Sequence, residues 1–211
     1  MSKVVALRPE LARAPTAVKG RVGPPRRRTN AELRPREHLT EAEVEALIKA
    51  AGGAGRHRER DKTLILVAYT HGLRVSELIS LQWSQVDFQG YLHVKRRKNG
   101  RDATHPLRGR EIRALRKLQR LYQGSRFVFT TERKGPLTAS TVRRIVTRAG
   151  QQAGFTFPVH PHMLRHAIGY KLANDRHDTR HIQQYLGHRN IAHTVRYTEL
   201  ASGAFDGFFS D

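Results

Sequence analysis

The chain contains no cysteine, which excludes disulfide bridges, cysteine-ligated zinc and thiol catalysis. It also has no long hydrophobic run, because the longest, Leu64 to Tyr69, is far too short to cross a bilayer. The first residues lack the apolar core that a signal peptide needs. No glycine-rich loop of the nucleotide-hydrolase kind is present, so the use of ATP is not indicated. We therefore expect a cytoplasmic protein that needs no cofactor.

Acidic residues are scarce in this chain. Its 211 residues include 18 Asp and Glu against 39 Lys and Arg, which gives a formal net charge of +21. So much like charge repels itself in a compact domain, so we expect a polyanionic partner. Arginine outnumbers lysine, and because its guanidinium matches phosphate oxygens, nucleic acid is favoured over an anionic membrane. A DNA partner would place the protein in the nucleoid. Charge alone also fits a solvated basic surface or a structural protein of the ribosomal type.

The length suits one domain of ordinary size with a tail. Residues 1–37 are rich in Arg, Pro and Gly and show no hydrophobic period, so we interpret them as a flexible basic N-terminal arm that lies along phosphates. A disordered tail without a role is the alternative. Residues 38–199 form the folded domain. Residues 200–211 form a C-terminal tail whose aromatic side chains need a surface to pack on: Phe205, Phe208 and Phe209.

Helical patterns dominate the folded part. Thr40 and Glu43 fit a capping box that starts a helix ending at Gly52-Gly53. A second helix, from about 61 to 71, is apolar nearly all round, so it should be the central buried helix, and Gly72 ends it. Amphipathic patterns predict further helices over 110–122, from 138 or 140 to about 154, over 162–174 and over 181–186.

Strand patterns are few and short. Residues 91–96 alternate as a strand, Asn99-Gly100 marks a tight turn, and residues 104–107 form the return strand. Residues 127–129 are predicted to form one more short strand. The sequence therefore predicts an α+β fold that is mainly helical, with a small antiparallel β-hairpin at one edge.

Several basic residues and one tyrosine suit attack on a phosphodiester. Such a reaction needs cationic donors on the non-bridging oxygens, a nucleophile in line, and an acid for the leaving oxygen. Arg74 and Arg165 can clamp the oxygens, and His162, three residues before Arg165, shares its helical face. Lys98, on the predicted hairpin turn, can protonate the leaving 5′ oxygen, and Tyr197 can attack. A further hydrogen bond can come from His188.

Each of these residues also has an ordinary structural interpretation. Arg74 and Glu77 fit a solvated surface pair, Lys98 a plain turn lysine, and Tyr197 a core tyrosine. His162 and His166 have the four-residue spacing of a zinc site, but the missing cysteine and the absence of a nearby acid argue against any metal. The remaining histidines of this region are expected to be structural or surface residues: His160, His166 and His177.

The combination of motifs resembles the tyrosine recombinase (phage integrase) family. That family has an Arg-x-x-Glu after a buried helix, a hairpin Lys, a His-x-x-Arg, a Leu-Gly-His, and a Tyr nine residues later. These motifs stand here, in order, as Arg74-Val75-Ser76-Glu77, Lys98, His162-Met163-Leu164-Arg165, Leu186-Gly187-His188 and Tyr197. The resemblance runs from about residue 39 to 209. Most members carry a separate helical domain ahead of the catalytic one, where this chain has only the basic arm.

Within the family, the chain is most similar to the short recombinases that invert a fimbrial promoter switch in bacteria. The likeness lies in residues 160–167 and 184–198, and in 97–100 with 104–107. It implies a site-specific recombinase of double-stranded DNA that inverts a promoter-type element, with a DNA-binding regulator lacking strand exchange as the alternative. A type IB topoisomerase shares the chemistry, but the short chain and the fimbrial-type motifs argue against it.

The resemblance also implies roles for residues. Tyr197 forms a 3′-phosphotyrosyl link, assisted by the other catalytic residues Arg74, Lys98, His162, Arg165 and His188, and Glu77 supports the site. A homotetramer would act on paired DNA sites, monomeric or dimeric when free, with accessory DNA-bending proteins possible and the tail docked on a neighbouring protomer. For DNA binding we expect basic residues of the hairpin and of the outer face of the helix after 138: Arg96, Arg97, Arg143, Arg144 and Arg148.

Overall fold

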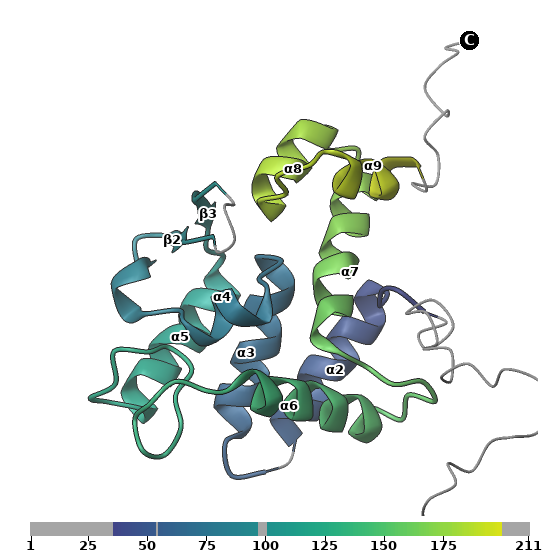
Figure 1. Cartoon of the computed structure of the whole chain (residues 1–211). Coiled ribbons are helices and arrows are strands. Elements are labelled where there is room, and N and C mark those ends of the chain that lie inside the picture. Colours follow the sequence, from purple (N-terminus) through teal and green to yellow (C-terminus); the bar gives the residue numbers. More distant parts are fainter. Residues whose placement is uncertain (1–35, 54, 97–100, 200–211) are drawn as a thin grey trace, which may run out of the picture. The chain divides into compact units, whose positions relative to one another are not determined.

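The computed structural model describes residues 36–53, 55–96 and 101–199. These residues belong to one unit that begins at Arg36. Its helices are α2 Glu41–Gly53, α3 Arg58–Thr70, α4 Val75–Ile79, α5 Gly109–Leu121, α6 Ala139–Gln152, α7 Pro161–Asn174, α8 Thr179–Leu186 and α9 Ala192–Glu199. The strands are β1 Val86–Asp87, β2 Tyr91–Val94 and β3 Ala103–Pro106. The predicted α+β, mainly helical fold is confirmed (Figure 1).

Helix α2 begins as the capping pattern predicts. The Thr40 backbone N–H donates to the Glu43 carboxylate at 2.8 Å, and the Glu43 N–H donates to the Thr40 hydroxyl at 3.3 Å. Just upstream, Arg36 forms a two-pronged ion pair with Glu43, and Glu37 pairs with Arg196 on α9. Residues 36 and 37, which the sequence assigned to the arm, therefore contact the folded unit.

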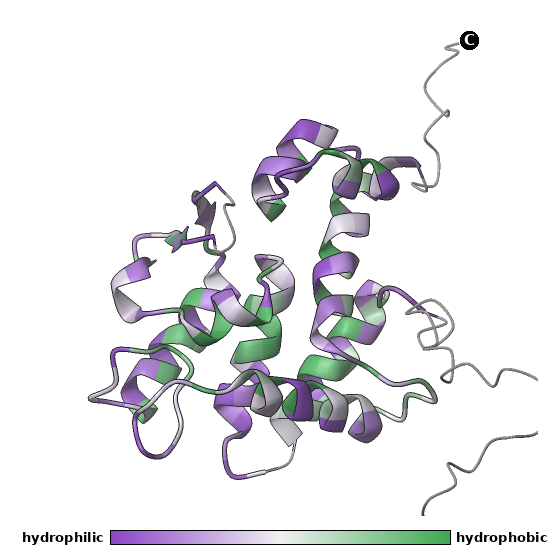
Figure 2. Cartoon of the chain, viewed as in Figure 1, coloured by the Kyte–Doolittle hydropathy of each residue, from purple (hydrophilic) through white to green (hydrophobic). Residues whose placement is uncertain are grey.

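Helix α3 is the buried centre of the bundle. A continuous run, Thr63 to Ala68, is buried, because α2, α5 and α7 all pack around it. Figure 2 shows hydrophobic residues gathered on α3 and on the helix sides that face it. Gly72, at φ +57°, lets the chain turn sharply after the helix into the segment that carries Arg74.

The small sheet is antiparallel with strand order β1-β2-β3. Leu92 lies opposite His105 and Val94 lies opposite Ala103. The buried Leu92 and Val94 alternate with the exposed Tyr91 and His93, as a strand with one covered face requires. The predicted turn at Asn99-Gly100 lies outside the described residues.

The C-terminal helices build the upper part of the unit. Helix α7 runs from the bundle to α8 and α9, which pack on each other and on α7 (Figure 1). Asp178 caps the start of α8 by accepting from the backbone N–H groups of Arg180 and His181. Gly187, at φ +66°, ends that helix.

The structure differs from the sequence prediction in a few short elements. Residues 127–129 form no strand, because Phe127 makes only an isolated bridge with Gln82. Helix α9, strand β1 and the five-residue helix α4, which follows Arg74, had no clear pattern in the sequence. No helix in the described part of the chain is long and apolar enough to span a membrane.

Candidate active site

Arg74 and Glu77 form the first half of the site. Arg74 precedes α4, and its backbone N–H and its guanidinium each donate to the Glu77 carboxylate at 2.9 Å. The Arg74 side chain is 29% exposed, whereas the Glu77 side chain is 2% exposed. Burial works to raise the pKa of Glu77, but the charge of Arg96 and the bonds from Arg74 outweigh it and lower that pKa. Glu77 is therefore an ionised, buried anchor rather than a member of a solvated surface pair.

Arg165 joins this half to α8. From α7 its guanidinium donates to the carbonyls of Gly72 and Leu186, the latter at 2.7 Å. The residue is 2% exposed, and burial, together with the charges of Arg74 and Arg96, lowers its pKa to about 9. Arg165 remains a cation at neutral pH. It lies beneath the surface, with its donors held by main-chain oxygens.

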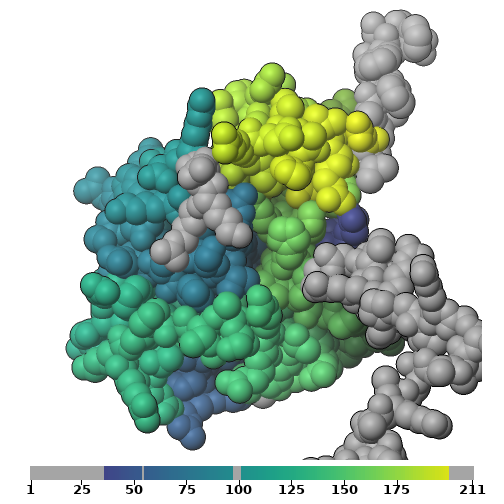
Figure 3. Space-filling model, in the orientation of Figure 1, coloured from purple at the N-terminus to yellow at the C-terminus, as the bar shows by residue number. Residues whose placement is uncertain are grey.

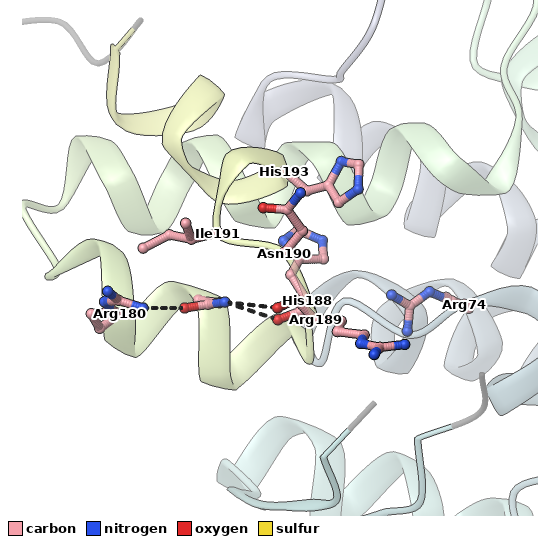
Figure 4. Close-up of a pocket in the computed structure, with 8 residues that line it drawn as sticks. Arg74, Arg180, His188, Arg189, Asn190, Ile191 and His193 are labelled. Carbon is pink, nitrogen blue, oxygen red and sulfur yellow. Dashed lines mark hydrogen bonds between the residues drawn. The ribbon is translucent and has the colours of Figure 1, made fainter. Parts of the chain in front are cut away.

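An open pocket lies beside Arg74 and the turn after α8. Its lining includes Arg74, Arg180, His188, Arg189, Asn190 and His193. Figure 4 shows Arg74 on one side of this pocket and the residues of the turn on the other. In the space-filling view the C-terminal helices rise beside the segment that carries the hairpin (Figure 3). A pocket lined by three guanidinium groups suits an anion such as a phosphate.

His188 enters the pocket as a neutral imidazole. Burial, with the charges of Arg165 and Arg74, lowers its pKa to about 3. Its Nδ1 lies 2.8 Å from the hydroxyl of Thr194, a fully buried residue of α9. In the tautomer in which Thr194 donates to Nδ1, the proton of His188 sits on Nε2, where it can be donated to a phosphate oxygen.

Tyr197, on α9, is buried against α7. The residue is 1% exposed, and its hydroxyl lies 2.9 Å from Nδ1 of His166. Its ring packs edge-on against Tyr170, with centroids 5.0 Å apart, and flat against His188 at 6.2 Å. Gly169 leaves room for the ring, since a Cβ there would come within 2.8 Å of it. Burial raises the pKa of Tyr197 to about 12, although Arg165 and Arg196 pull it down.

His162 lies at the exposed start of α7, with its ring 4.4 Å from that of His166. His166, which the sequence placed among structural or surface residues, is the polar partner of the Tyr197 hydroxyl. Burial lowers the pKa of His166 to about 3, so it is neutral. In the described part of the chain, no three His, Asp or Glu side chains are grouped to hold a metal ion.

The structure thus gathers five of the predicted site residues in one region: Arg74, Glu77, Arg165, His188 and Tyr197. Two further residues fall outside the described residues, namely Lys98 and the expected DNA contact Arg97. The three tail phenylalanines fall outside them as well.

A family model matches the part of the chain that carries these site residues. The model of the phage integrase family matches residues 37–203, which is most of the chain and includes every motif of the site. The chain belongs to the phage integrase family. It is accordingly a site-specific tyrosine recombinase, and the resemblance of its motifs is confirmed.

The recombinase is similar over most of its length to two proteins of Escherichia coli K12. It is 39% identical over 188 residues to the type 1 fimbriae regulatory protein FimB, covering 86% of this chain and 94% of FimB. It is 42% identical over 183 residues to the type 1 fimbriae regulatory protein FimE, covering 82% of this chain and 91% of FimE. The predicted likeness to short fimbrial recombinases is therefore confirmed.

Solved recombinases share the fold. The crystal structure of XerA recombinase superposes with a TM-score of 0.69 at 30% identity, covering 82% of this chain and 64% of that one. A lambda integrase dimer bound to a COC′ core site gives a TM-score of 0.63 at 25% identity, covering 77% of this chain and 48% of that one. The recombinase thus spans less than two thirds of these two solved chains.

The structure also places the arginines that the sequence assigned to DNA. Arg143 and Arg144 are exposed on α6, as expected, whereas Arg148 on the same helix pairs with the buried Asp61 at 3.2 Å. Arg96 does not lie at the surface: its side chain is fully buried and pairs with Glu77 at 2.8 Å. Arg96 lies two residues beyond Val94, the last residue of β2, so it continues the inward-facing alternation of that strand.

Sequence reasoning missed two arginines of the pocket. Arg180, in the first turn of α8, and Arg189, directly after the Leu-Gly-His motif, both line it with Arg74. Their proximity to the motif was the only available signal. Nothing in residue spacing shows that the start of α8 and the turn after it open onto the same hollow.

Proposed function

We propose that this recombinase cuts and rejoins double-stranded DNA through Tyr197 and inverts a promoter-type element. The observation that carries the proposal is the convergence of the buried Arg165, the partly exposed Arg74, a neutral histidine and one tyrosine beside a cationic pocket. The similarity to FimB and FimE over nearly their whole lengths supports inversion as the outcome. The DNA-bound lambda integrase of the same fold supports DNA as the partner.

In the proposed reaction the scissile phosphate enters the pocket beside Arg74. The phenol of Tyr197 gives up its proton to solvent as its oxygen attacks phosphorus, so a phosphotyrosyl bond to the 3′ strand end forms as the bond to the 5′ oxygen breaks. The leaving oxygen takes a proton, for which Lys98 is the expected donor. The 5′ hydroxyl of a partner strand then attacks the phosphotyrosyl link and releases Tyr197, so no bond energy is lost and no cofactor is consumed.

Cationic groups stabilise the charge that builds on the phosphate oxygens. Arg74 and Arg165 supply fixed positive charge, and His162 and His188 supply hydrogen bonds. Because Tyr197 is 1% exposed, its side chain must move out of its buried position against α7 before its oxygen can attack phosphorus. Near a bound phosphate and its arginines the phenol would also lose the burial that raises its pKa.

The wider assembly follows from the same proposal. Two rounds of exchange need four protomers on two DNA sites, and accessory DNA-bending proteins would help to pair these sites. The residues before Arg36 would act as a basic arm along phosphates, residues 36–199 as the catalytic domain, and residues 200–211 as a segment that docks on a neighbouring protomer. Arg143 and Arg144 offer exposed charge on α6 for the DNA backbone.

A covalent adduct tests the proposal. The DNA flanking the gene is searched for short inverted repeats, and a nicked duplex carrying one repeat is incubated with the protein. The wild type should form a denaturation-resistant adduct, and Tyr197→Phe should form none. Tyr170→Phe is the matched control, because it removes a hydroxyl from the neighbouring ring, 5.0 Å away, and should still form the adduct. An adduct in Tyr197→Phe would refute the assigned nucleophile.

A plasmid assay tests the outcome of the reaction. The flanking repeats are cloned in inverted orientation around a marker with an asymmetric restriction site, and inversion appears as a new pair of fragments. Relaxation of a plasmid that lacks the repeats would favour topoisomerase activity. Binding to the repeats without an adduct would favour the regulator that lacks strand exchange.

A further inference from the structure

Three consecutive carbonyl groups at the end of α8 each accept from a different arginine. Arg96 donates to the carbonyl of Tyr185, Arg165 donates to that of Leu186 at 2.7 Å, and Arg74 reaches that of Gly187 at 3.5 Å. The last carbonyls of a helix lack partners within the helix and carry partial negative charge. The end of α8 therefore holds three guanidinium groups, of which only two were expected in the site.

Arg96 is also locked to the opposite side of the site. Its Nη1 lies 2.8 Å from Oε2 of Glu77, and both side chains are almost completely buried. The other oxygen of the same carboxylate accepts from Arg74. A buried carboxylate held by two guanidinium groups forms a rigid fork, because each arginine fixes the plane in which the other binds. Glu77 thus links Arg96 to the exposed clamp Arg74.

The backbone of the turn after α8 is built around Arg96. A Cβ at Gly187 would come within 2.7 Å of Nε of Arg96 and within 3.0 Å of its Cδ and Cγ. Only glycine leaves room for the arginine side chain at this left-handed position. His188, the next residue, therefore takes its place in the pocket from a turn that rests against Arg96.

The charges of Arg74, Arg96 and Glu77 together decide how Arg74 can act on a ligand. Arg74 and Arg96 together balance Glu77 and leave one net positive charge beside the pocket. Without Arg96, the single charge of Arg74 would be neutralised by Glu77, to which its guanidinium is already bonded at 2.9 Å. Arg74 and Glu77 would then carry no net positive charge with which Arg74 could act on a phosphate.

We infer that Arg96 is a positioning residue for the recombination reaction, which holds Arg74 through Glu77 and the His188 turn through the end of α8. This role replaces the expected contact of Arg96 with DNA, and it rests on the proposed function. It predicts a defect in cleavage rather than in DNA binding. It also predicts that the defect depends on the negative charge of the scissile phosphate.

The test compares Arg96→Met with Arg60→Met as a matched control. Arg60 is also a buried arginine, but it pairs with Asp61 and the carbonyl of Thr130, away from the pocket. Single-turnover adduct formation and DNA affinity are measured on the nicked duplex, with thermal melting to count folded protein. Arg96→Met should slow adduct formation by about 10- to 100-fold per folded molecule, the usual effect of removing a charged hydrogen bond, with affinity changed less than about threefold. Arg60→Met should retain the wild-type rate.

Two further arms separate positioning from simple loss of structure. On a duplex with a methylphosphonate at the scissile position, which lacks the negative charge, the defect in strand cleavage should shrink by about tenfold or more. The second change Glu77→Gln in the Arg96→Met protein should recover part of the rate, because it removes the charge that neutralises Arg74. Arg96→Lys, which keeps the charge but cannot bond both partners, should give an intermediate rate.

Each outcome is decisive. Equal rates for Arg96→Met and the wild type overturn the inference, as does an equal loss in Arg60→Met. A defect that is unchanged on the methylphosphonate site and unrelieved by Glu77→Gln also overturns it. If Arg96→Met does not fold, the Arg96→Met/Glu77→Gln protein and Arg96→Lys carry the same comparison. A wild type that forms no adduct on any repeat refutes the proposed function itself.

Discussion

The buried position of Tyr197 against α7 leads to a prediction about Gly169. In Gly169→Ala the new methyl group would lie 2.8 Å from Cε2 and Cζ of the Tyr197 ring and 3.0 Å from Cδ2. Gly169 is buried within α7, between helix turns that cannot shift on their own. The ring must therefore move, and it can do so if α9 lifts away from α7.

The magnitude follows from two opposing effects. Crowding a packed site usually costs about 1–3 kcal/mol. Alanine is better than glycine inside a helix by about 1 kcal/mol, which favours α7 whether or not α9 is docked. Global stability should thus change little, whereas the docking of α9 should weaken by about 1–3 kcal/mol, or roughly five- to 150-fold in its opening equilibrium.

Amide hydrogen exchange resolved by residue measures this opening. The amides of residues 192–199 should exchange roughly five- to 150-fold faster in Gly169→Ala, with those of α3 unchanged. Gly150→Ala is the matched control, since its Cβ would press within 2.6 Å of Val159 in a different part of the core. It should leave exchange in α9 at the wild-type rate. Unchanged exchange of α9 in Gly169→Ala would refute the packing argument, and so would equal acceleration throughout the domain.

Two further predictions concern pH and salt. Burial lowers the pKa of His105 to about 3 from an ordinary 6.5, so its contribution to stability is complete above pH 6.5 and is lost as the pH falls toward 3. Urea unfolding between pH 7 and 4.5 should therefore show a fall in unfolding free energy that His105→Gln makes shallower by up to about 1.4 kcal/mol per pH unit; equal slopes would contradict the shift. Replacing the exposed Arg143 and Arg144 by alanine should reduce the slope of log affinity against log salt by about 1.8 if both contact phosphates. An unchanged slope in filter-binding titrations would remove α6 from the DNA interface.

Local patterns in the sequence determined much of this protein. The capping residues Thr40 and Glu43 start α2, and the apolar run in α3 makes it the central helix, because both effects act between near neighbours in the chain. The spaced motifs around Arg74, Arg165, His188 and Tyr197 identified the family, since each motif keeps its spacing within one helix or turn.

Tertiary structure alone decided how these pieces meet. The burial of Tyr197 depends on Gly169 and His166. These two residues lie on α7, which α8 separates from α9 in the chain, but they adjoin the Tyr197 ring in space. Arg96 was assigned to DNA from its charge and its basic neighbours, yet the pairing of β2 with β3 and the end of α8 turn it toward Glu77. A charged side chain faces inward only where partners from distant segments offset its desolvation, and residue spacing does not reveal those partners.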